Sequence, residues 1–97
     1  MRYNFEWDLE KNKRNQKKHR VTFEQAATVF RDPRMLSLYD DEHSEAKEER
    51  WITLGLSAVS GLLIVHHTFR EIDAETVDIR IFSSRKATKQ EIKQYSE

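Results

Sequence analysis

The first residues of the chain alternate between aromatic and polar side chains. In RYNFEW, residues 2–7, every second position is aromatic, and this period of two is typical of a strand with one buried face. A helix headed by Asp8 as its N-cap is predicted to follow and to run to about Lys18. No large apolar residue lies between Leu9 and Val21, so polar contacts and the flanking segments must hold this helix to the protein.

A second helix has the apolar stripe that the first one lacks. Thr22 and Gln25, three positions later, form a capping box, and Asp32-Pro33 ends the helix. Four apolar residues share one helical face: Phe23, Ala26, Ala27 and Phe30. This face is predicted to pack on the core.

Strand patterns occupy most of the remaining chain. They cover residues 35–39, 49–56, 62–69 and 76–84. Because the connections are short, the last three strands are predicted to form an antiparallel meander.

A last helix is predicted over residues 87–95. Thr88 and Glu91 form its capping box, and its spacing directs Ile92 and Tyr95 inward. The whole order of elements indicates an α+β fold, in which a single antiparallel sheet is packed with helices. With 97 residues in all, positions 1–97 are expected to form one domain.

Composition limits the setting in which the protein works. The longest apolar run, Leu62 to Val65, is too short for a membrane span, and the first residues show no signal-peptide pattern. Cysteine is absent, so disulfide chemistry is excluded. We therefore expect a cytoplasmic protein that does not associate with membranes.

Positive charge is concentrated in one segment of a chain whose net charge is zero. Residues 11–20 contain six Lys and Arg side chains and His19, and the next acidic residue is Glu24. Runs of charge are usually solvated faces. This one lies on a helix without an apolar stripe, which favours a functional role as a site for an anionic polymer.

Strand alternation places further cations on the sheet. His66 and His67 fall on opposite faces, so at most one of them can join a given site. The arginines in or beside the strands are Arg50, Arg70, Arg80 and Arg85. We expect them to face the basic helix and to bind a phosphodiester, because guanidinium groups offer a flat fork of donors to two phosphate oxygens. A solvated polar sheet face is the alternative interpretation.

A cation cluster of this kind also suits RNA cleavage. Attack of a ribose 2′-hydroxyl on the adjacent phosphorus builds negative charge on the phosphate oxygens, and fixed cations stabilise that charge without a metal ion. Histidine titrates near neutral pH, so His19, with Lys18, is a candidate for proton transfer or substrate positioning. The commoner role of such a histidine is to close the helix onto the fold. His43 lies in an acidic loop without the ligand spacing of a zinc site, so we expect no metal and no cofactor.

Several spaced motifs occur in one order along nearly the whole chain. They are FEWD, KH.VTF..A..VF.DP, ERW..LG and IRIFSSRKAT, between Phe5 and Tyr95. In these motifs the chain resembles the BrnT family of bacterial toxins, whose fold is similar to that of RelE-type ribonuclease toxins. The resemblance implies a metal-independent endoribonuclease that arrests growth. It also implies a BrnA-like ribbon-helix-helix antitoxin, which blocks the toxin and carries it to operator DNA.

The basic residues of that family fall on the positions already selected. They are Lys18, His19, Arg50, Arg70, Arg80 and Arg85. Two departures from the family pattern stand out. The family usually has glycine where this chain has Arg20, which predicts strain or a different turn. Glu71 and Ile72 replace a typical glycine turn and leave the register of Arg70 open.

Two other functions fit the same residues. A non-enzymatic module could hold nucleic acid or a partner through its basic helix and sheet, with salt-sensitive binding and no cleavage. The chain could also serve as a co-repressor subunit, a role compatible with either activity.

Overall fold

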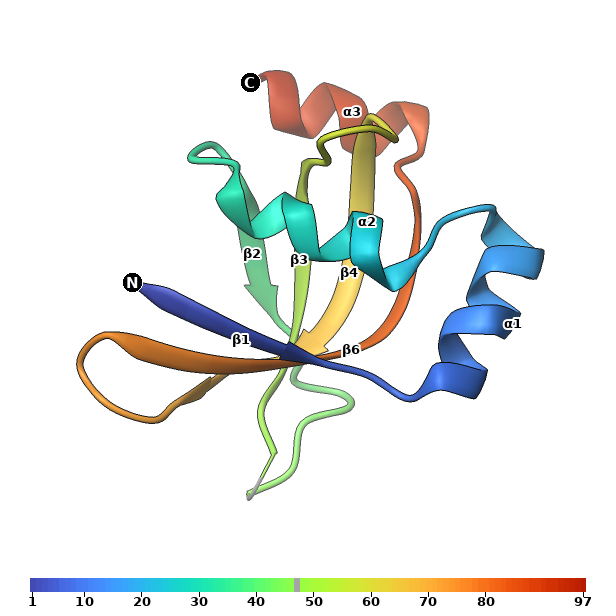
Figure 1. Ribbon diagram of the computed structural model, residues 1–97. Coiled ribbons are helices and arrows are strands. Elements are labelled where there is room, and N and C mark those ends of the chain that lie inside the picture. Colours follow the sequence, from blue (N-terminus) through green and yellow to red (C-terminus); the bar gives the residue numbers. More distant parts are fainter. Residues whose placement is uncertain (47) are drawn as a thin grey trace.

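The computed structural model describes residues 1–46 and 48–97. Its elements, in chain order, are β1 (Arg2–Glu6), α1 (Leu9–His19), α2 (Phe23–Ala27), the 3₁₀ helix η1 (Thr28–Arg31), β2 (Leu36–Tyr39), β3 (Arg50–Leu56), β4 (Leu62–Thr68), β5 (Arg70–Glu71), β6 (Thr76–Lys86) and α3 (Lys89–Ser96). Figure 1 shows α2 crossing one face of the sheet, α3 at one end and α1 beside β6. No helix in the described part of the chain is long and apolar enough to cross a bilayer.

The sheet confirms the predicted α+β fold and the predicted meander. Its 6 strands in the described residues follow the order β1-β6-β4-β3-β2, with β5 also paired to β6. Strands β3, β4 and β6 pair antiparallel in sequence order. The sheet is nevertheless mixed, because β1 pairs parallel with β6. Most of the chain separates these two strands, and it supplies the long crossover that a parallel pair requires.

The long strand β6 has different neighbours along its length. Its first half, Thr76 to Arg80, pairs with β1, and its second half pairs with β4. The register shifts at His66/His67: Ile81 pairs with His67, while Ser83 pairs with His66. Phe82 is therefore the extra residue of a β-bulge, a feature that redirects side chains and bends the strand.

The core lies between the sheet and the segment formed by α2 and η1. Phe23 and Ala26 are completely buried, and Phe30 is nearly so. They pack against sheet residues Leu63, Val65, Val77, Ile79 and Ile81. The capping box of Thr22 and Gln25 is present, which confirms the predicted helix start. The last predicted turn is a 3₁₀ helix instead of α-helix.

Helix α1 is attached by asparagine side chains instead of an apolar stripe. The buried amide of Asn15 donates to the carbonyl oxygens of Val21 and Ser84, at 2.9 and 2.8 Å, and its oxygen accepts from the Ser84 N–H. The oxygen of Asn12 accepts from the N–H of Phe23. The prediction that polar contacts hold this helix is confirmed.

The residue that ends α1 has the backbone conformation that glycine usually supplies. Arg20 has φ 58° and ψ 32°, and its N–H donates to the carbonyl of Gln16. The left-handed turn is thus formed without glycine, and the predicted alternative turn is wrong. Because a Cβ is disfavoured at such a φ, Arg20 carries local strain.

Helix α3 closes one end of the molecule. The predicted capping box of Thr88 and Glu91 is present. The Tyr95 hydroxyl donates to the Asp32 carboxylate at 2.6 Å, so this side chain does point inward. Ile92 is 42% exposed, and its predicted inward position is wrong. The contacts that attach α3 use Glu91, which binds Arg85, and Tyr95, which binds Asp32.

Candidate functional site

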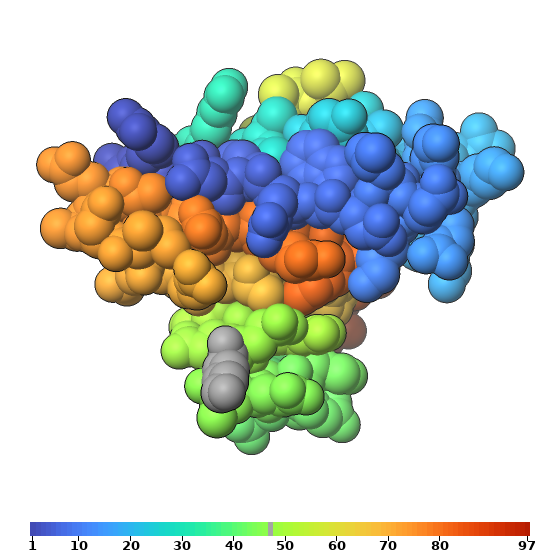
Figure 2. Space-filling model, turned by 60° about the horizontal axis from the view of Figure 1, so that its bottom comes forward, coloured from blue at the N-terminus to red at the C-terminus, as the bar shows by residue number. Residues whose placement is uncertain are grey.

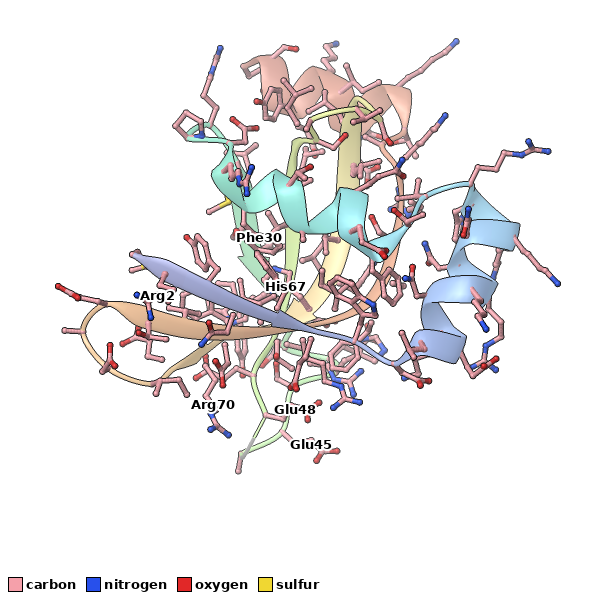
Figure 3. The ribbon with its side chains drawn as sticks, in the orientation of Figure 1. Arg2, Phe30, Glu45, Glu48, His67 and Arg70 are labelled. Carbon is pink, nitrogen blue, oxygen red and sulfur yellow. The ribbon has the colours of Figure 1, made fainter. Side chains whose placement is uncertain are left out.

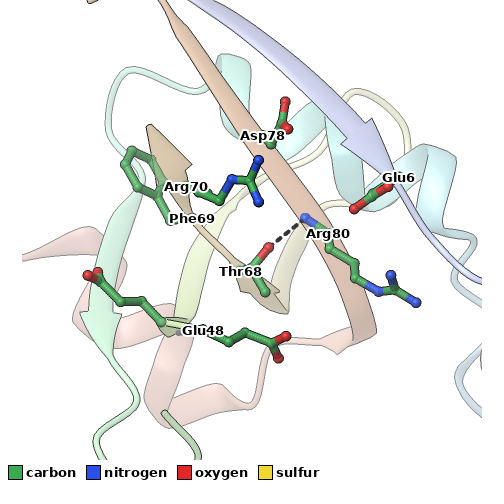
Figure 4. A pocket seen from close by; sticks show the side chains of 8 residues that line it. Glu6, Glu48, Thr68, Phe69, Arg70, Asp78 and Arg80 are labelled. Carbon is green, nitrogen blue, oxygen red and sulfur yellow. Dashed lines mark hydrogen bonds between the residues drawn. The ribbon is translucent and has the colours of Figure 1, made fainter. Parts of the chain in front are cut away.

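Three of the four candidate arginines lie around the carboxyl end of β4. Arg50 is the cross-strand partner of Thr68, and the Thr68 hydroxyl accepts from the backbone N–H of Arg80 at 2.9 Å. Arg70 follows Thr68 by two positions and pairs with Asp78 of β6. Figure 4 shows Arg70 and Arg80 on either side of Thr68. The β5 pairing settles the register of Arg70, which the sequence left open.

A cavity of about 180 Å³ lies between Arg70 and Arg80. Its other lining residues are Thr68, Phe69, Glu6, Glu48, Glu49 and Asp78. Four carboxylates thus surround two guanidinium groups, and they weaken the attraction of this cavity for a phosphate. Glu48 comes from the connection between β2 and β3, whose described residues, 40–46 and 48–49, lie beneath β6 in Figure 2. Figure 3 labels Glu45 and Glu48 of this connection.

Arg50 lies beside this cavity and belongs to a second arrangement. Its guanidinium carbon is 4.2 Å from the centroid of the Phe82 ring, and the Lys11 ammonium is 5.5 Å from the same centroid. Cations are attracted to an aromatic face at such distances. Arg50 also forms an ion pair with Glu48 at 3.2 Å, in which both side chains are partly exposed. The basic helix therefore reaches the sheet cations through Lys11 and Phe82.

Arg85, on β6, lies beside the amino-terminal half of β4, and its guanidinium group is bound by a carboxylate. It pairs with Ile64, four residues and so about 13 Å from Thr68 along the strand. Its two terminal nitrogens donate to the two oxygens of Glu91, at 2.8 and 3.0 Å. The hydrogen bonds from Arg85 lower the pKa of Glu91 to about 2. Arg85 is thus paired with a carboxylate from α3, and its place in one site with the other arginines stays a prediction.

The candidate pair on α1 lies in its last turn. Lys18 is exposed and His19 is half-buried. Among the described residues, neither side chain takes part in a hydrogen bond or ion pair. Asn15, one turn earlier, is already level with Ser84, so Lys18 and His19 lie toward the Arg85 end of the sheet. They do not join Arg50, Arg70 and Arg80.

The two adjacent histidines have different environments, as the alternation predicts. His67 is buried on the core face beneath Phe30, as Figure 3 shows. Its Nδ1 lies 2.8 Å from the Thr68 carbonyl, so Nδ1 carries the proton, and its Nε2 accepts from the Thr53 hydroxyl. Burial lowers the pKa of His67 to about 4, so this ring is neutral and structural.

His66 faces a different cavity on the other side of the sheet. This cavity has a volume of about 280 Å³ and is lined by Asp40, His43, Arg50, Trp51, His66, His67, Phe82 and Ser83. Burial, followed by the charge of Arg85, lowers the pKa of the half-buried His66. The sequence placed His66 with cations and Thr68 but left its role open. It gave no sign of the Phe82 bulge or of the contact with Lys11.

The sequence of this chain matches one family model over most of its length. That model is described as the ribonuclease toxin BrnT of a type II toxin-antitoxin system, and it matches residues 7–91. No curated protein matches the chain. The matched segment contains α1, the start of α3 and, apart from Glu6, the residues that line the cavity between Arg70 and Arg80.

Proposed function

The chain belongs to the BrnT family of type II ribonuclease toxins, and from this membership we propose that it is a metal-independent endoribonuclease that arrests growth. Membership implies RNA as substrate and an antitoxin as partner. The finer partner assignment, a BrnA-like ribbon-helix-helix protein that neutralises the toxin and carries it to operator DNA, is part of the same proposal.

The observation that supports RNA cleavage best is the grouping of Arg50, Arg70 and Arg80 around Thr68. Because their backbones are fixed by strand pairing, these arginines can contact one phosphodiester together. They stabilise the equatorial phosphate oxygens most strongly when the 2′-oxygen attacks and negative charge accumulates. Catalysis of this kind requires cations and proton transfer, and it can proceed without a metal ion.

Each candidate residue has a proposed role that follows from its position. Arg50, Arg70 and Arg80 contact the reacting phosphate. Lys18 and His19, at the far end of α1, guide the RNA strand toward them. Arg85 becomes available to RNA only if the Glu91 ion pair opens, so in the closed conformation it supports the sheet end.

Substitution of Arg80 tests the role of the sheet arginines. Arg80→Ala is expected to abolish growth arrest and to lower RNA cleavage by at least about 100-fold, because one fixed donor to the transition state is lost. The thermal melting temperature should stay within a few degrees, since the Arg80 side chain is exposed. Arg31→Ala, at another exposed arginine on η1, is the matched control and should remain fully toxic.

A binding module without nuclease activity is the second candidate function. It is favoured by the four carboxylates around Arg70 and Arg80, which reduce the positive potential there. Incubation of purified protein with long RNA in the presence of a chelator separates the two functions. Discrete products that disappear with Arg80→Ala support the nuclease. Intact RNA together with salt-sensitive binding supports the module.

A further inference from the structure

His66 lines the same cavity as Arg50. Among the described residues, the ring of His66 makes no hydrogen bond. The other histidines on the sheet side are engaged: His43 contacts both oxygens of Asp40, and His67 uses both ring nitrogens inside the core. His66 therefore keeps a free nitrogen for a molecule in the cavity.

The position of His66 relative to Arg50 fits one phosphodiester. Arg50 is paired with Thr68, and His66 precedes Thr68 by two residues on the same face. Such diagonal neighbours on adjacent antiparallel strands lie roughly 7–8 Å apart. A phosphate that contacts the Arg50 guanidinium can thus present its neighbouring ribose hydroxyl to the His66 ring.

The Phe82 bulge fixes the cation in this arrangement. An extra residue in β6 turns the Phe82 ring toward the cavity, and the Arg50 guanidinium rests on that ring at 4.2 Å. The contact favours one orientation of a long side chain, and Lys11 adds a second positive charge on the same ring. The cavity therefore combines a free imidazole with a cation that rests on Phe82 and is also paired with the partly exposed Glu48. A phosphate must replace Glu48 to contact the Arg50 guanidinium.

Charged groups on every side of the cavity set the protonation of His66. Burial and the charges of Arg85 and His43 lower its pKa, while Asp40 and Glu91 act in the opposite direction. The net shift is downward, so the ring is neutral at neutral pH and can accept a proton.

We propose that His66 is the catalytic residue that accepts the proton of the attacking 2′-hydroxyl while Arg50 contacts the phosphate. The 2′-oxygen forms a bond to phosphorus as its proton passes to the free nitrogen of His66. The bond from phosphorus to the 5′-oxygen breaks, and that oxygen takes a proton from water. The His66 proton then returns to the resulting hydroxide, which leaves a 2′,3′-cyclic phosphate, a 5′-hydroxyl and the original imidazole. The assignment rests on the ribonuclease function proposed above.

Single-turnover cleavage of a defined RNA, measured from pH 5 to 9, tests the assignment. For the unaltered protein, the logarithm of the rate should rise with a slope of one through the acid range, where His66 loses its proton, and then level off. His66→Asn should lower the plateau rate by roughly 100- to 10,000-fold and remove this dependence on pH. The melting temperature should change little, since the ring makes no hydrogen bond in the described residues.

Two further variants make the result specific. His66→Ala should recover activity when imidazole is added, because the cavity can then admit a free base. His19→Asn should keep the acid dependence whatever its rate, since His19 lies on the last turn of α1. The assignment is overturned if His66→Asn cleaves as fast as the unaltered protein, or if His19→Asn removes the acid dependence instead. An unaltered protein that cleaves no RNA contradicts the ribonuclease function itself, and the two failures are therefore distinguishable.

Discussion

In this protein, single side chains have structural roles that glycine, a paired strand or an apolar stripe usually has. Arg20 holds a left-handed turn, Asn15 completes hydrogen bonds on the edge of β6, and Phe82 supports a guanidinium group. Substitutions at these positions therefore have effects that their exposure alone would not indicate.

Replacement of the strained arginine should stabilise the fold. Arg20→Gly is expected to raise the free energy of unfolding by about 0.5–1 kcal/mol, because glycine adopts a positive φ without the penalty of a Cβ. Urea denaturation at neutral pH measures this change. Arg20→Ala keeps the Cβ and is the control, for which little stabilisation is expected. A glycine variant that is less stable than the alanine variant would contradict this account.

Removal of the Asn15 amide should have the opposite effect. Asn15→Ala leaves the Val21 and Ser84 carbonyls and the Ser84 N–H without their partner in a buried place. Unsatisfied buried groups of this kind are costly, and we expect a loss of roughly 2–4 kcal/mol in chemical denaturation. Asn4→Ala, which removes an exposed hydrogen bond to Asp78, should cost less than about 1 kcal/mol. If the two substitutions lower the free energy of unfolding equally, the buried Asn15 hydrogen bonds stabilise the fold no more than an exposed one.

At the scale of elements, α1 continues the sheet where β1 stops. β1 pairs with β6 only as far as Arg80, and the Asn15 side chain then supplies a donor and an acceptor to Ser84, as the next residue of a paired strand would. Lys11, on the same helix, places its ammonium 5.5 Å from the centroid of the Phe82 ring on β6. Helix α1 is thus attached along β6, and it brings one of its cations, Lys11, to the ring on which Arg50 rests.

Helix α3 acts on the opposite end of β6 through the Arg85–Glu91 ion pair. This pair engages the Arg85 guanidinium, and it also links the last helix to the sheet. Both side chains keep contact with solvent, so the pair is a modest source of stability. Its larger consequence is that one of the candidate arginines is unavailable while α3 stays in place.

At the scale of the whole molecule, two buried or paired groups make stability depend on pH in separate ranges. His67 has a folded pKa of about 4 against 6.5 for the free side chain. The unfolded chain therefore binds this proton first, and stability falls as the pH drops from 6.5 toward 4. Glu91, with a pKa lowered from 4.5 to about 2, adds a second loss below pH 4.5.

The contribution of His67 can be measured directly. Its ring should show no protonation by NMR until the pH approaches 4, and acidification from pH 6.5 to 4 should remove roughly 3 kcal/mol of folding free energy. In His67→Gln the dependence on pH in this range should be largely absent, while the loss below pH 4.5 remains. A ring that titrates near 6.5 in the folded protein would refute the assignment.

Much of the architecture could be predicted because its signals are local. The capping boxes at Thr22 and Thr88, the alternation that separates His66 from His67, and the apolar stripe of α2 all depend on neighbours within a few positions. The spaced motifs likewise indicate the family, and the family match over residues 7–91 confirms it.

The sequence by itself determined the elements, the buried faces and the kind of chemistry that the cations suit, since these follow from residue type and short-range period. Only the tertiary structure decided which charges meet. The bulge at Phe82 interrupts the period of two, Glu91 reaches Arg85 from a separate helix, and Glu48 and Glu49 bring carboxylates to the arginines. These contacts depend on how distant segments are folded together, and a pattern read along the chain does not contain that information.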